Sequence, residues 1–166
     1  MQTFVPDPSF QESLQMLDKK RLGKQRLEAW QILGNLKKDR TVGWGRHVIM
    51  YMWRGFEPAL EHYYNLCLEE FSRRGCKNIK LKPIEITQPI IMPPWVGDPR
   101  IHLSHQSQIL GKIQNQPKMI EWYKQWNWSV EPYALKYVWP DALRMIRENK
   151  FIYRTSEDKT WITLDA

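Results

Sequence analysis

The stretch Leu-Asp-Lys-Lys-Arg-Leu-Gly-Lys-Gln-Arg-Leu-Glu-Ala, residues 17–29, constrains the fold most strongly, because it combines a helical pattern with a high density of positive charge. Five of the eight residues 19–26 are Lys or Arg. At about 100° per residue, one face of such a helix carries four polar side chains, Arg21, Lys24, Gln25 and Glu28. Leu22 and Leu33 fall on the opposite side. We therefore expect an amphipathic helix whose polar face holds one carboxylate among positive charges.

This polar face has two interpretations. In the first, the face binds phosphate groups and Glu28 acts as a catalytic acid or base. In the second, it is an ordinary solvated helix face on which Lys24 and Glu28 form an i,i+4 ion pair. Gly23 favours the first interpretation. A glycine inside a helix costs about 1 kcal/mol relative to alanine, which is easier to understand where another backbone, of protein or DNA, comes close.

The patterns on either side of this stretch predict a mainly α fold in a single domain. One helical region covers residues 8–38, with a break near Asp18 and a start capped by Ser9 or Asp7. Further helices are expected at residues 48–54, 57–74, 100–113, 117–126 and 140–149. Five prolines make residues 81–99 an extended segment. Weak alternation on both sides of residues 156–159 predicts a terminal β-hairpin.

Composition and charge narrow the class of partner. The 166 residues fit one domain, and the formal net charge of +7 favours polyanions: nucleic acid first, an anionic membrane surface second. No apolar run approaches the roughly 20 residues that span a membrane, and the first residues do not resemble a signal peptide. We therefore expect a cytoplasmic protein, in which Cys67 and Cys76 are reduced thiols.

Two further segments mix aromatic and charged residues. Gly43–His47 and the following residues 52–56 suit contacts to bases and phosphates, although core aromatics with a capping His47 would give the same pattern. In residues 133–140 an aromatic cluster lies beside one lysine, which is typical either of core packing or of a stacking surface.

Residues 95–105 carry two histidines, His102 and His105, at i,i+3 spacing. Because no third ligand at useful spacing is evident, we expect no metal site here. A phosphate-contacting helix start is favoured instead, with Ser104 and His105 exposed. The chain lacks a phosphate-binding Gly-rich loop, a dinucleotide fingerprint and a Gly-x-Ser-x-Gly elbow, which argues against ATP hydrolysis, dinucleotide chemistry and α/β-hydrolase chemistry.

Taken in order, these motifs resemble the pyrimidine dimer DNA glycosylase family, of the phage endonuclease V type, and come closest to a phage and bacterial branch of it. The resemblance covers roughly residues 1–140. The motifs that carry it are the run at 17–29, Gly-Trp-x-x-His at 43–47, the helix ending Arg73-Arg74-Gly75, Pro-Pro-Trp-x-Gly-Asp-Pro-Arg at 93–100 and Tyr-Val-Trp-Pro at 137–140.

The resemblance implies a compact, mainly α fold of the endonuclease V type over residues 1–140, with 141–166 as an extension packed on the same domain. It implies a base-excision DNA repair enzyme that removes the 5′ base of a cyclobutane pyrimidine dimer and then nicks the abasic strand. The nucleophile of the family is the α-amine at the chain terminus, and its essential acid matches Glu28. The histidine before the next helix matches His47.

The amine chemistry is physically reasonable. An α-amine titrates at about 7.7–8.0 and a lysine side chain near 10.4, so that more of the α-amine is neutral at physiological pH. Attack at the sugar C1′ gives an imine, and a nearby carboxylate can stabilise positive charge and transfer protons. Gln2 normally leaves the initiator in place, which makes Met1 the expected nucleophile; a water activated by Glu28 is the alternative. An extended lead of about nine residues at ~3.3 Å each can bring the terminus beside Glu28.

From these arguments we expect a monomer that binds double-stranded DNA containing damaged bases, and that uses neither cofactor nor metal nor membrane. The expected DNA-binding residues are Arg21, Lys24, Gln25, Arg26, His47, Arg100 and His105. Two alternatives remain open: a glycosylase of the same fold that acts on another modified base, and a nucleic-acid-binding module without catalysis.

Overall fold

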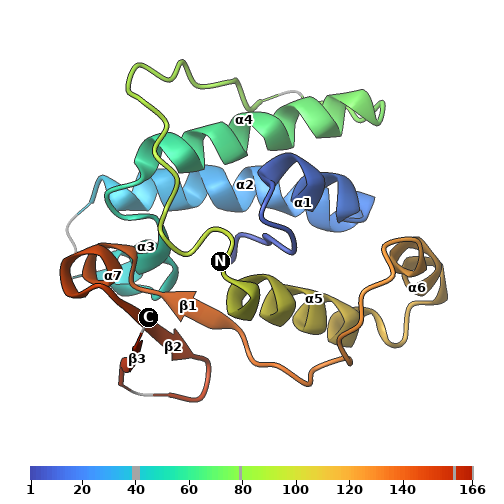
Figure 1. Cartoon of the computed structure of the whole chain (residues 1–166). Helices are drawn as coiled ribbons and strands as arrows, with labels where there is room; N and C mark the ends of the chain where they lie inside the picture. The colour runs from blue at the N-terminus through green and yellow to red at the C-terminus, as the bar shows by residue number, and fades with distance from the viewer. Residues whose placement is uncertain (39–41, 79, 159, 166) are drawn as a thin grey trace.

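Two long helices, α2 (Lys19–Leu36) and α4 (Glu57–Arg73), lie side by side and form one layer of the protein, in the upper part of Figure 1. The structure is a computed structural model that describes residues 1–38, 42–78, 80–158 and 160–165. Within these ranges the other elements are α1 (Phe10–Met16), the 3-10 helix η1 (Gly43–Arg46), α3 (Ile49–Trp53), α5 (Pro99–Ile113), α6 (Pro117–Lys124), β1 (Val138–Pro140), α7 (Ala142–Glu148), β2 (Lys150–Thr155) and β3 (Ile162–Asp165). The mainly α fold predicted from the sequence is confirmed.

Helix α2 begins where the sequence predicts a break. The carboxylate of Asp18 accepts hydrogen bonds from the backbone N–H groups of Lys20 and Arg21, which caps the helix. The apolar face of α2 packs on α4. A Cβ atom at Gly23 would lie 3.4 Å from the ring of Phe71 on α4. No protein backbone approaches Gly23 here, because its neighbour is an aromatic side chain; the approach of a DNA backbone stays a prediction.

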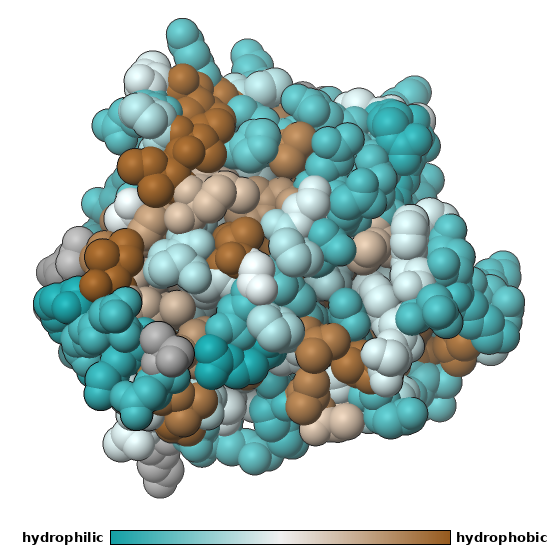
Figure 2. Space-filling view, in the orientation of Figure 1, coloured by the Kyte–Doolittle hydropathy of each residue, from teal (hydrophilic) through white to brown (hydrophobic). Residues whose placement is uncertain are grey.

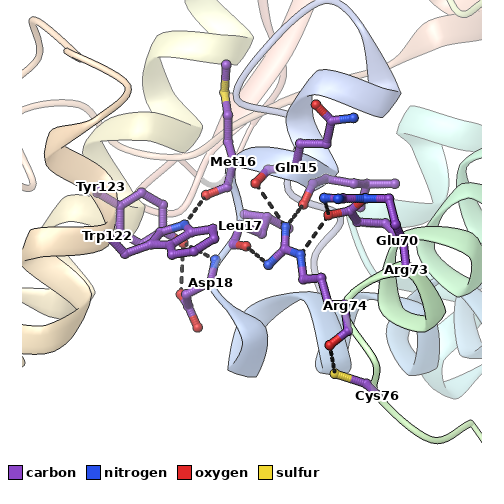
Figure 3. Close-up of polar contacts among 11 residues, drawn as sticks. Gln15, Met16, Leu17, Asp18, Glu70, Arg73, Arg74, Cys76, Trp122 and Tyr123 are labelled. Atoms are coloured by element: carbon purple, nitrogen blue, oxygen red, sulfur yellow. Dashed lines mark hydrogen bonds and ion pairs between the residues drawn. The ribbon is translucent and has the colours of Figure 1, made fainter.

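Arg74, just after α4, locks the junction between α1 and α2 (Figure 3). Its guanidinium donates to the backbone carbonyls of Leu14, Gln15 and Leu17 at 2.6–3.0 Å. These carbonyls lie at the end of α1, where a helix leaves its last C=O groups without internal partners. The contact fixes the direction in which α2 leaves α1, and so fixes the face that α2 turns outward.

From α6, Tyr123 adds a second clamp on the same junction. Its hydroxyl donates to Asp18 Oδ2 at 2.8 Å and accepts the N–H of Asp18 at 3.0 Å. Burial alone would raise the pKa of Asp18, but hydrogen bonds and the charge of Arg21 outweigh it and lower that pKa. Asp18 is therefore an ionised structural group rather than a free acid.

Residues 81–93 form neither helix nor strand, as their prolines predict, but the expected extended conformation does not continue to residue 99, because a turn at residues 94–97 leads into α5. Figure 1 shows this segment crossing back over α4 before descending to α5. Ile90, Ile91 and Met92 are exposed along it, and apolar atoms gather where it crosses the upper left of the space-filling view (Figure 2). Trp95 anchors the end of the segment, because its buried indole N–H donates to the carbonyl of Met52 at 2.8 Å.

A three-stranded antiparallel sheet, in the order β1-β2-β3, closes the other side of the protein. The predicted terminal hairpin is present as β2 and β3; Lys159, in its predicted turn, lies outside the described residues. The sheet crosses position 140, since β1 pairs with β2, and the boundary between 1–140 and 141–166 stays a prediction. Among the described residues, no helix has both the length and the apolar character needed to span a bilayer.

Candidate active site

The first six residues run as an extended lead between α2 and α5. On the α2 side, Gln25 Oε1 accepts the N–H of Phe4 at 2.8 Å and Gln25 Nε2 donates to the carbonyl of Gln2 at 3.1 Å. On the α5 side, His105 Nδ1 accepts the N–H of Val5 at 2.8 Å. Side chains from two helices thus replace the strand partners that such a segment would otherwise need. The chain terminus is held in one place by these bonds.

Two residues expected to bind DNA have a structural role in this arrangement. Gln25 and His105 are both 0% exposed. The expected exposure of Ser104 and His105 is wrong, because this part of α5 turns toward the N-terminal lead. Burial, with the nearby charges of His102 and Lys112, lowers the pKa of His105 to about 3. His105 is therefore a neutral acceptor for a backbone N–H, and no contact with DNA is proposed for it.

Beside the terminus lies a cavity of about 420 Å³. Its walls come from the N-terminal lead, from α2 and α5, from His47 two positions before α3, and from β1 with the residue before it. Figure 1 shows these elements around the start of the chain. The lining residues are Met1, Gln2, Phe4, Lys20, Arg21, Lys24, Glu28, His47, Lys112, Tyr137 and Trp139. The cavity therefore joins an amine, a carboxylate, several cations and an aromatic surface.

Glu28 is tied to the terminus rather than to its helix neighbours. Its Oε2 accepts the backbone N–H of Gln2 at 2.8 Å. Among the described residues it forms no ion pair with Lys24, so the arrangement expected of a plain solvated face is not the one observed. If Met1 were removed, the amine of Gln2 would stand at the atom that now lies 2.8 Å from this carboxylate.

His47 both caps a helix and lines the cavity. Its Nδ1 accepts the N–H of Ile49 at 3.2 Å, at the start of α3. Partial burial and the positive charge of the N-terminal amine both lower the pKa of His47, so the amine lies within electrostatic reach of the ring. Trp44, 54% exposed, packs on His47 with ring centroids 5.2 Å apart. His47 therefore does accept a helix N–H, as one interpretation of residues 43–47 expects, but Trp44 is not a core aromatic, and contact with DNA stays a prediction.

Lys112 was not singled out in the sequence. Its Nζ lies 5.3 Å from the ring centroid of Phe4 and 5.2 Å from that of Tyr137, inside the cavity. Partial burial, and then repulsion by the cations Arg21 and Lys24, lower the pKa of this lysine. A signal was present: Lys112 follows His105 by seven residues, two turns of α5, which puts both on one helix face.

The other expected DNA-binding residues divide into two groups. Arg21, Lys24 and His47 line the cavity, and Arg21 is also bound to Asp18 at 2.6 Å. Arg26 and Arg100 lie outside it. Arg26 donates to Asn78 at 2.7 Å and stacks 4.1 Å from the ring centroid of Phe71.

Arg100 is bound to its own helix cap and to the C-terminal sheet. It pairs with Asp98 at 2.6 Å, and its guanidinium carbon lies 3.6 Å from the ring centroid of Phe151 on β2. Within the described residues, no group of three or more His, Cys, Asp or Glu could hold a metal ion. The residues that line the cavity supply an amine, a carboxylate, an imidazole and several positive charges.

Comparison with known proteins bears on the same part of the chain. Residues 1–83, half of the sequence, match the family model described as pyrimidine dimer DNA glycosylase. No curated protein and no solved structure matches the chain. The matched half contains Met1, Glu28 and His47, which meet at the cavity. By this match over half of its length, the chain belongs to the pyrimidine dimer DNA glycosylase family.

Proposed function

We propose that this protein is a DNA repair glycosylase with abasic-site lyase activity, which excises bases from cyclobutane pyrimidine dimers. Membership of the family supports a glycosylase that acts on DNA. The observation that carries the finer proposal is the hydrogen bond of 2.8 Å from Gln2 N–H to Glu28, which holds a carboxylate next to the terminal residue in a cationic cavity.

In the proposed reaction the neutral α-amine of Met1 attacks the sugar C1′ as the bond from C1′ to the base breaks. The amine loses a proton when the new N–C1′ bond forms, and the departing base gains one. Opening of the sugar ring moves the remaining N–H proton to the ring oxygen and gives an imine. With the imine nitrogen protonated, loss of a proton from C2′ expels the 3′ phosphate, and water then hydrolyses the imine and frees the amine. Glu28 stabilises positive charge at the sugar and carries these protons, since its carboxylate lies beside the terminus.

The cations of α2 would hold the DNA backbone on either side of the reacting sugar. Lys20 and Lys24 are exposed at the cavity, and Arg21 lies next to them. Phosphate contacts of this kind position a duplex without reading its sequence. They would therefore place the strand while leaving the choice of base to other groups.

The first experiment compares UV-irradiated and untreated supercoiled plasmid. The proposal predicts nicks in the irradiated plasmid alone, because lesion removal precedes strand cleavage. Equal nicking of both plasmids would contradict lesion specificity. Binding without nicking of either would favour a nucleic-acid-binding module.

The second experiment identifies the nucleophile. Borohydride present during the reaction reduces an imine to a stable protein–DNA cross-link, which we expect mass spectrometry to map to Met1, or to Gln2 if Met1 is removed. Acetylating the terminus should abolish the cross-link and the lyase activity. A cross-link on Lys24 or Lys112, or full activity with a blocked terminus, would overturn this assignment. Base release without a trappable adduct would indicate water activated by Glu28.

A further inference from the structure

The 3-10 helix η1 and the residue before it present an apolar tip, formed by Val42 and Trp44, beside the cavity. These two side chains are 62% and 54% exposed. Neither lines the cavity, but Trp44 packs on His47, which does, with ring centroids 5.2 Å apart. Large apolar groups that gather on a surface commonly mark a contact with another molecule. The amine and carboxylate steps proposed above give this tip no role.

Hydrogen bonds on both sides of the tryptophan hold the apolar tip in place. The carbonyl of the buried Gly45 accepts from Arg54 Nη2 at 3.3 Å, and the carbonyl of Trp44 accepts the N–H of His47 at 3.0 Å. Gly43, which precedes the tryptophan, has a φ of +52°, a left-handed conformation that glycine adopts readily. The indole is therefore presented by a fixed turn, which lowers the entropy cost of a contact that it makes.

Positive charge accompanies the apolar tip. Arg46 is exposed in the same turn, and Lys20 and Lys24 are exposed at the cavity. Among the described residues, none of these three cations takes part in an ion pair. An apolar tip next to unpaired cations suits a partner whose apolar surface lies between lines of negative charge. Duplex DNA is such a partner, because its bases are reached through a groove between two phosphate backbones.

The proposed reaction requires that the duplex be deformed at the lesion. In a stacked duplex the sugar C1′ lies at the minor-groove edge, close to the neighbouring nucleotides, and the α-amine of Met1 has to approach it there. Proteins that bind the minor groove frequently insert an apolar side chain between two base steps, which partly unstacks them and kinks the duplex by roughly 20–90°. Trp44 lies on His47 at the edge of the cavity that holds the amine, so it is placed for such an insertion.

We propose that Trp44 inserts from the minor groove between the base pairs next to the lesion and acts as a wedge that holds the duplex kinked. This inference rests on the proposed function, which brings the sugar of the lesion to the cavity. Trp44 is then a positioning residue, because it touches the neighbouring base pairs and none of the reacting atoms. Its contact does not depend on the identity of those bases, since every base has a face that can stack on an aromatic ring.

The test measures the kink directly. A duplex with a donor dye at one end and an acceptor dye at the other carries a tetrahydrofuran abasic analogue, which has no C1′ hydroxyl and so forms no imine. We expect energy transfer to rise when the wild-type protein saturates this duplex, and Trp44→Ala to lose most of that rise. Because unstacking one base step costs a few kcal/mol, the loss of the wedge should lower kcat/KM on a cyclobutane-dimer duplex by about tenfold or more. Trp44→Phe keeps an aromatic wedge and should recover most of both effects.

Controls separate this role from a structural one and from the proposed function itself. Trp30→Ala removes another exposed tryptophan, which lines a different cavity, and should change neither energy transfer nor rate. If Trp44 only supports His47, Trp44→Ala would change the rate and its pH profile but leave energy transfer at the wild-type value, which would overturn the inference. A duplex that stays straight with the wild-type protein would overturn it as well. If the wild-type protein kinks the duplex but cleaves no dimer, the proposed function fails, and energy transfer with Trp44→Ala still decides on the wedge. Trp44→Phe serves this comparison if the alanine variant unfolds.

Discussion

The two halves of the chain contribute different chemistry to one cavity. Residues 1–83 supply the terminal amine, Glu28, His47 and the cations of α2. The rest of the chain supplies Lys112 and the aromatic pair at 137–139. The family match stops at the end of the first half. Membership of the family therefore indicates a kind of reaction, while part of the cavity wall comes from residues that the family match does not cover.

Changing Glu28 should have the largest effect and should separate the halves most clearly. Glu28→Gln keeps an oxygen that can accept the N–H of Gln2, so the terminus should stay in place. We expect kcat to fall by about 10²- to 10⁴-fold for both base excision and abasic-site cleavage, with binding to the damaged duplex retained.

Single-turnover rates on a duplex with a cyclobutane dimer and on a duplex with a preformed abasic site, with binding measured in parallel, check this prediction. Rates within a few-fold of wild type would exclude Glu28 as the catalytic acid or base. Loss of binding along with activity would mean instead that the carboxylate mainly holds the terminus.

Low pH should destabilise the folded protein at His105, which joins α5 to the N-terminal segment through its hydrogen bond with Val5. The pKa of His105 is about 3 in the folded protein and near 6.5 for an unperturbed histidine, so the unfolded chain takes up the proton first. This contribution to stability is complete above pH 6.5 and is lost as the pH falls toward 3. The main cause is the burial of the ring, which disfavours its charged form. Protonation at Nδ1 would also remove the acceptor for the N–H of Val5.

Urea unfolding at pH 7 and pH 4.5 measures this effect. We expect the free energy of unfolding to drop by a few kcal/mol between the two pH values in the wild-type protein. His105→Gln, which cannot take up this proton, should be less stable at pH 7 but should show a smaller drop. Equal drops in the two proteins would show that other groups govern acid unfolding.

The sequence could predict those features of the fold and of the site that depend on residues close to one another along the chain. The break at Asp18 follows from a capping residue before a helical pattern, and the structure shows that cap. The absence of a helix over residues 81–93 follows from the prolines there, each of which restricts its own backbone. Glu28 could be chosen because it is the one carboxylate on the cationic face, and it lies beside the terminus, as expected.

What the sequence could not predict depends on contacts between distant residues. The burial of His105 arises from its bond to Val5, 100 positions away, and a helical pattern does not reveal which segment will cover it. The spacing from His105 places Lys112 on the same face of α5, but only the fold shows that this face lies over Phe4. Strand β1 is three residues long and ends in Pro140, too short for any alternation, and it exists because β2 pairs with it.

The smallest expected effect concerns two basic residues on α2, and it tests which part of that helix faces DNA. Lys24 is exposed at the cavity, whereas Arg26 is bound to Asn78 and stacked on Phe71 on the other flank of the helix. Lys24→Ala and Arg26→Ala remove the same charge two residues apart. Each lost phosphate contact lowers the slope of log affinity against log salt by about 0.9 for duplex DNA. We therefore expect Lys24→Ala to lower that slope by about 0.9, the value for one phosphate contact, and Arg26→Ala to leave it nearly unchanged.

Fluorescence anisotropy with an undamaged duplex over a range of salt concentrations measures the slope, and a thermal melt checks that Arg26→Ala remains folded. Equal slopes for the two variants would show that DNA senses only the net charge of α2, and a larger loss with Arg26→Ala would place the duplex on the opposite flank, away from the cavity.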